Sequence, residues 1–76
     1  MTIQQIQELH QARPFRPFDI HLADGRSIPV EHLEFLAQSP GGRTIAVGRA
    51  DDTIETVDVL LVTSLKPRPN GRRSRR

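Results

Sequence analysis

Apolar residues follow two different periods along this chain, a helical period at its start and a period of two afterwards. Thr2 followed by Gln5 is typical of a capping box at the start of a helix. Pro14 disfavours helical geometry in the residue before it. The pattern therefore predicts a short amphipathic helix from residue 2 to about residue 12. The apolar face of this helix consists of Ile3, Ile6 and Leu9.

From residue 18 onward, apolar and polar residues alternate as they do in strands. Asp24-Gly25 predicts a two-residue type I′ turn, in which both residues need a positive φ. Pro29 cannot donate a ladder hydrogen bond, so its strand is expected at an edge or on a bulge. Asp58 is expected to cap a tight turn over residues 59–61. The predicted strands cover residues 18–23, 28–30, 44–48, 53–57 and 62–65.

The connections between these strands are too short for helical crossovers, so the strands are expected to be antiparallel. The chain is therefore predicted to be mainly β, with a short N-terminal α-helix followed by a small, strongly bent five-stranded antiparallel barrel. Closing such a barrel removes most exposed edges. Residues 1–66 are expected to form the barrel domain. Residues 67–76 are expected to form a flexible, disordered, Arg-rich basic tail.

The order of elements and residues 18–25 resemble the Sm-like, Src-homology-3-type small barrel, in a pattern similar to the bacterial RNA chaperone Hfq. The resemblance implies the same fold. It does not carry over the pore-side RNA site, because Val57 and Asp58 stand where Hfq-type proteins have a lysine–histidine pair. Residues 16–26 and 58–63 also resemble segments of short bacterial proteins of unknown function, which implies no activity.

The formal charge of the chain changes sign near residue 66. Residues 1–65 carry five arginines and nine carboxylates, a net charge of −4, whereas residues 66–76 carry six cations and no acid. Arginine has planar paired donors that suit phosphate oxygens, and no aromatic residue is interleaved for stacking on bases. Contact with the phosphate backbone of RNA or DNA is one interpretation, and a solubilising tail is the other. The candidate residues are Lys66, Arg68, Arg72, Arg73, Arg75 and Arg76.

Other candidate chemistry is weak. The three histidines match no spacing of metal ligands, and the chain has no cysteine. The pairs Glu31/Glu34 and Asp51/Asp52 would need a cleft that shifts a pKa, and a small barrel fills its interior with side chains. We therefore predict no catalytic residue, metal, cofactor or small-molecule substrate.

These observations favour a non-enzymatic binding module. In one hypothesis the basic tail contacts nucleic acid. In the alternative, the barrel edges or the N-terminal helix bind another protein or a second copy, since so small a domain gains stability from association. The N-terminus does not resemble a signal peptide, and the longest apolar run, residues 59–62, is too short to span a bilayer. A cytoplasmic location without membrane contact is expected.

Overall fold

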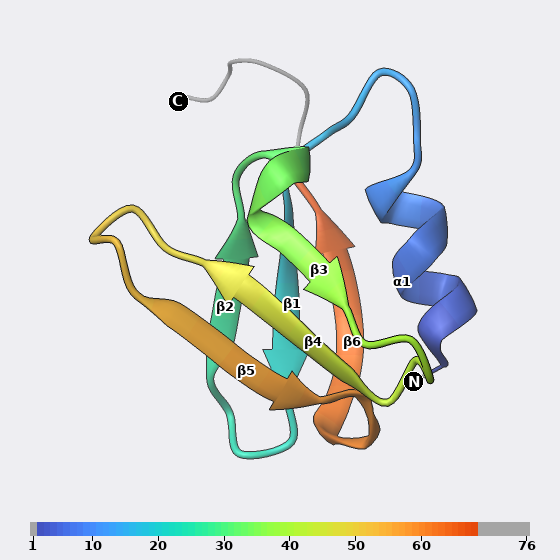
Figure 1. Cartoon of the computed structure of the whole chain (residues 1–76), viewed down its shortest axis with the longest axis vertical. Helices are drawn as coiled ribbons and strands as arrows, with labels where there is room; N and C mark the ends of the chain where they lie inside the picture. Colours follow the sequence, from blue (N-terminus) through green and yellow to red (C-terminus); the bar gives the residue numbers. More distant parts are fainter. Residues whose placement is uncertain (1, 69–76) are drawn as a thin grey trace.

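The computed structural model describes residues 2–68, which form one helix and two three-stranded antiparallel sheets (Figure 1). The strand orders are β2-β1-β6 and β3-β4-β5. Figure 1 shows one sheet in front of the other with their strands crossing, and the helix at the side of both. The elements are α1 (Ile3–His10), β1 (Phe18–Leu22), β2 (Ser27–Val30), η1 (Leu33–Phe35), β3 (Leu36–Gln38), β4 (Thr44–Gly48), β5 (Ile54–Asp58), η2 (Val59–Leu61) and β6 (Val62–Pro67).

The predicted N-terminal helix is confirmed, although it ends at His10, before the expected residue 12. Gln5 Oε1 accepts a hydrogen bond from the Thr2 backbone N–H at 3.0 Å, which is the glutamine half of the capping box. Ile6 lies in the core and is only 1% exposed. The two other residues of the predicted apolar face are partly buried against the same core. The helix is therefore held by tertiary packing, as so short a helix requires.

Two polar contacts fix α1 along the β3 side of the second sheet. Gln7 Nε2 donates to Gln38 Oε1 at 3.1 Å. His10 Nε2 lies 2.7 Å from the backbone oxygen of Leu33. Because Leu33 and Gln38 lie at the two ends of the η1–β3 segment, these contacts align the helix with that segment.

The core lies between the two sheets and is closed at the side by α1. In β1, Phe18, Ile20 and Leu22 are buried, whereas the two residues between them are half-buried on the outer face. β4 repeats the same alternation. The predicted period of two is thus confirmed in both strands. The core consists of Ile6, Phe18, Ile20, Leu22, Ile28, Val30, Leu36, Ile45, Val47, Val57, Val59 and Val62.

The predicted five-stranded barrel is wrong in two respects, because the described residues form six strands and the sheets do not close into a barrel. The additional strand is β3, which pairs with β4 from Leu36↔Val47 to Gln38↔Ile45. The sequence did not predict this strand because the apolar residues around it do not alternate. Leu33 and Phe35 belong to the tight turn η1, and β3 itself has only three residues.

The turn η2 forms a corner between the two sheets. Val59 N–H donates to the Arg43 oxygen next to β4, and Ala23 N–H, next to β1, donates to the Leu61 oxygen, both at 2.8 Å. The Asp58 carboxylate caps this turn by accepting from the Leu60 N–H at 2.9 Å, as predicted. η2 leads from β5 in one sheet directly into β6 in the other. Among the described residues these two strands lie at the edges of their sheets and do not pair with each other.

The β1–β2 hairpin has a different turn from the predicted type I′ turn. The Leu22 oxygen accepts a hydrogen bond from the Gly25 N–H, and the Leu22 N–H donates to the Arg26 oxygen. Gly25 has a φ of 93°, whereas Asp24 has no positive φ. This is a three-residue loop, in which a turn is followed by one left-handed residue. The position of Pro29 on an edge strand is confirmed, because β2 is the outer strand of its sheet.

Within residues 2–68, no helix is both long enough and apolar enough to cross a membrane.

Candidate nucleic-acid interface

The C-terminal tail begins at the end of β6, beside the start of β1. β6 pairs with β1 through Asp19↔Lys66 and Phe18↔Pro67. The Arg68 N–H then donates to the Pro17 oxygen at 2.9 Å and continues the pairing by one residue. The domain boundary expected after residue 66 therefore falls inside the last strand.

The Arg68 side chain contacts the acidic body of the protein. Its Nη2 lies 3.0 Å from Asp19 Oδ1, and its Nη1 lies 3.5 Å from Glu31 Oε2. The hydrogen bond with Asp19 is the largest cause that raises the pKa of the Arg68 guanidinium above its ordinary value. Arg68 was predicted to lie in the flexible tail. Instead, the structure holds it against β1 and the end of β2.

Arg16 joins this end of the molecule, which sequence reasoning did not predict. Its Nη2 donates to the Arg68 backbone oxygen at 2.7 Å from the loop between α1 and β1. Arg16 and Arg68 are 52 positions apart, and no sequence motif links them. Lys66 is exposed on β6 nearby, so the root of the tail gathers Arg16, Lys66 and Arg68. We call these three residues the tail root.

The acids at this end set a limit to its positive charge. Asp19 and Glu31 both lie within ion-pair distance of Arg68. Asp19 is also the residue directly opposite Lys66 in the sheet. The tail root is therefore a mixed patch, and the four arginines beyond it would supply most of the positive charge. Those four candidates, Arg72, Arg73, Arg75 and Arg76, lie outside the described residues.

Two further arginines of the body are paired within a separate cluster. Glu55 accepts from Arg26 Nη1 at 2.8 Å and from Arg49 Nη1 at 3.3 Å. Arg26 also contacts Asp24 at 3.0 Å. Since Asp24 and Arg26 lie in the hairpin that follows Leu22, this cluster is at the opposite end of β1 from the tail root. Both of its cations have carboxylate partners, as Arg68 does in the tail root.

Three of the other candidate residues, His10, Glu31 and Asp51, have structural contacts. Asp51 accepts hydrogen bonds from the Thr53 hydroxyl at 2.6 Å and from the Thr53 N–H at 3.2 Å, which is consistent with the predicted turn. Glu31 contacts Arg68, and His10 contacts a backbone oxygen. In the part of the chain from residue 2 to residue 68, no three His, Cys, Asp or Glu side chains gather as metal ligands would.

No protein-family model, curated protein or solved structure matches this chain. The resemblance to the Sm-like barrel and to Hfq therefore stays a prediction from the sequence.

Proposed function

We propose that this protein is a non-enzymatic binding module that contacts the phosphate backbone of RNA or DNA through its basic C-terminal segment. The observation that carries the proposal is the placement of Arg16 and Lys66 beside Arg68, where the acid-free segment leaves the body. Charged donors from two separate parts of the chain thus surround the start of the tail. Guanidinium and ammonium groups suit phosphate oxygens, and they carry no information about base sequence.

Binding of this kind is expected to depend steeply on salt, because each neutralised phosphate releases condensed counterions. On single strands the logarithm of the binding constant falls by about 0.7 per phosphate contact for each tenfold rise in salt. The absence of aromatic residues from the tail means that stacking on bases adds nothing there. Affinity is therefore expected to be similar for different sequences of the same length.

The test is a fluorescence-anisotropy titration of mixed-sequence RNA and DNA with the full chain at low and physiological salt. The variant replaces Arg72, Arg73, Arg75 and Arg76 with glutamine, and the matched control replaces the same four with lysine. The glutamine variant is expected to lose most of the affinity and most of the salt dependence, whereas the lysine variant keeps both. Equal binding by the wild type and the glutamine variant would contradict the proposal.

A second candidate function is a protein-interaction module. It is supported by the edge of β5, which pairs with no other strand among residues 2–68, and by two exposed apolar side chains near that edge, Ile54 at 73% and Leu61 at 52% exposure. Association through such an edge uses backbone hydrogen bonds and apolar contacts, so it is expected to persist at high salt. Sedimentation equilibrium and peptide titrations at high salt separate it from phosphate contact.

A further inference from the structure

Three of the four sheet edges in the described part of the chain are protected against strand addition. The Leu22 N–H at the end of β1 donates to the oxygen of Arg26, just before β2. In the antiparallel ladder only every second residue of β2 bonds to β1, so the backbone groups of residue 29 face the free side. Because Pro29 has no N–H, it offers no donor there. At the end of β6, the Arg68 N–H donates to the Pro17 oxygen, so the backbone groups of the preceding residue face the free side. That residue is Pro67, which has no N–H to offer there. The β3 edge is flanked by α1. Proline and covering elements are common means of blocking sheet edges.

Within residues 2–68, no proline and no covering element protects the β5 edge in this way. Two backbone hydrogen bonds flank this strand. Before it, the Arg49 N–H donates to the Thr53 oxygen, and after it, the Val59 N–H donates to the Arg43 oxygen. The alternation between them directs the backbone groups of residues 55 and 57 toward β4. The N–H and C=O groups of residues 54, 56 and 58 therefore point to the free side. Such a row of unpaired groups is a template for another strand.

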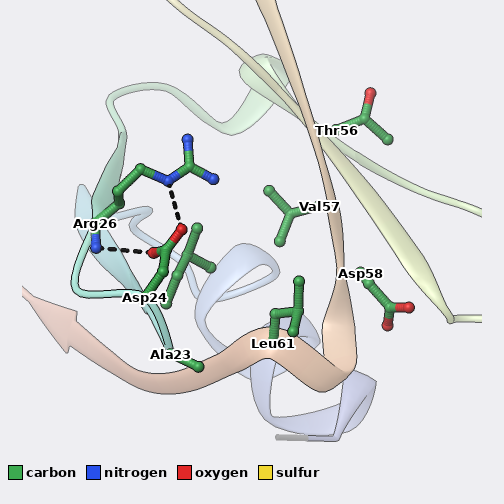
Figure 2. A pocket seen from close by; sticks show the side chains of 8 residues that line it. Ala23, Asp24, Arg26, Thr56, Val57, Asp58 and Leu61 are labelled. Atoms are coloured by element: carbon green, nitrogen blue, oxygen red, sulfur yellow. Dashed lines mark hydrogen bonds and ion pairs between the residues drawn. The ribbon is translucent and has the colours of Figure 1, made fainter.

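A groove of about 330 Å³ lies beside this edge, between β5 and the β1–β2 hairpin (Figure 2). In Figure 2, Val57 points toward the groove, whereas Thr56 and Asp58 point to the opposite side of the strand. Asp24 and Arg26 form an ion pair on the hairpin side of the groove. The apolar part of the lining consists of Leu22, Ala23, Val57 and Leu61.

We propose that β5 binds an extended segment of a partner protein as an added antiparallel strand. In this arrangement, the partner residue opposite Val57 inserts an apolar side chain into the groove. The preceding partner residue lies opposite Asp58, on the other face, where an exposed carboxylate favours lysine or arginine. Backbone hydrogen bonds supply the affinity and these two side chains supply the specificity. The inference rests on the second candidate function and specifies its partner.

A second copy of this chain fits the site less well. Antiparallel pairing of two β5 strands about Thr56 would place the apolar Ile54 opposite Asp58 of the second copy. Pairing with β2 or β6 of a second copy meets a proline that lacks an N–H on the free side. The partner segment is therefore assigned to another protein.

The probe is a fluorescein-labelled peptide with the sequence Thr-Lys-Leu-Thr-Thr-Val-Ser, in which leucine occupies the groove position and lysine faces Asp58. It is titrated into the full chain at high salt. Thr56→Pro removes an N–H on the free side that β4 does not use, and Thr56→Val is the matched control that retains it. We expect saturable binding that weakens about tenfold in Thr56→Pro, since a backbone hydrogen bond and its flanking contacts are lost. Thr56→Val is expected to bind like the wild type.

A second measurement does not depend on the folding of any variant. The same peptide, N-methylated at the threonine opposite Thr56, keeps its side chains and loses a backbone donor, so the wild-type protein is expected to bind it more weakly. Absence of saturable binding by the wild type overturns the inference, as does equal affinity for both peptides. If the wild type does not bind the peptide but self-associates, and Thr56→Pro abolishes this self-association, the inference is overturned and the interaction module is retained. If the wild type neither binds the peptide nor self-associates, the interaction module is overturned as well.

Discussion

Arg68 Nη2 lies 3.0 Å from Asp19 Oδ1, and this contact ties the start of the basic tail to the first strand of the body across 49 positions of sequence. The same guanidinium also contacts Glu31, the residue that follows β2. The acidic body and the basic segment are therefore in direct contact at one end of the sheet. The acids at this contact oppose the binding of a polyanion there.

Replacing Asp19 with asparagine is expected to strengthen the binding of RNA. The substitution removes a negative charge beside Lys66 and Arg68, and we expect the affinity to rise about two- to threefold at low salt. Fluorescence anisotropy at two salt concentrations measures the change. Asp24→Asn removes the same charge at the opposite end of β1 and serves as the control. An equal gain in both variants would show that only the net charge matters.

Replacing Ile6 with alanine is expected to destabilise the whole domain. Ile6 is 1% exposed and is the residue of α1 that lies in the core. Truncation leaves a cavity between the helix and the sheets, and we expect a loss of about 2–4 kcal/mol in the free energy of unfolding. Leu60→Ala is the control, because Leu60 is 79% exposed and its loss is expected to cost at most about 0.5 kcal/mol. Urea denaturation followed by circular dichroism compares the two, and equal losses would contradict the packing described for α1.

The loop between β3 and β4 contains two adjacent glycines, Gly41 and Gly42, which differ in backbone φ and in the space available for a Cβ atom. Gly42 has a φ of 74°, and a Cβ there would lie 3.1 Å from Ile3 Cγ2 on α1. Gly42→Ala is therefore expected to cost about 1 kcal/mol or more in thermal or chemical unfolding. At Gly41 a Cβ would meet nothing closer than Arg43 Cγ at 4.0 Å. Gly41→Ala is thus expected to be close to neutral, and the reverse order of the two variants would refute this account.

Acid is expected to destabilise the protein through two loop carboxylates. The hydrogen bond from the Arg26 N–H lowers the pKa of Asp24, and the hydrogen bond from the Thr53 hydroxyl lowers the pKa of Asp51, both from 3.8. Each folded-state carboxyl binds fewer protons than its unfolded form. Its contribution to stability is therefore fully present well above pH 3.8 and is lost as the pH falls through the lower folded-state pKa.

The measurement for this prediction is the thermal midpoint as a function of pH, with the double variant Asp24→Asn/Asp51→Asn as the comparison. Below about pH 4 the midpoint of the wild type is expected to fall more steeply than that of the variant. Parallel curves would mean that other carboxylates dominate the acid response.

Several local features of the fold were predictable from the sequence because they depend on neighbouring residues. The capping glutamine of α1, the alternation in β1 and β4, and the Asp58 cap of η2 each involve side chains within a few positions of one another. The placement of Pro29 at an edge was also predictable, since proline lacks a ladder donor. The type of the β1–β2 turn was not, because Asp-Gly is compatible with loops of two or three residues.

The sequence by itself determined the mainly β character, the amphipathic helix and the separation of an acidic body from a basic end, because composition and periodicity specify them. Only the tertiary structure decided that residues 2–68 form two sheets with an additional strand β3, that β5 is an unprotected edge among these residues, and that Arg16 contacts Arg68. These features depend on pairings between residues far apart in the chain, whose geometry follows from how the elements pack around one core.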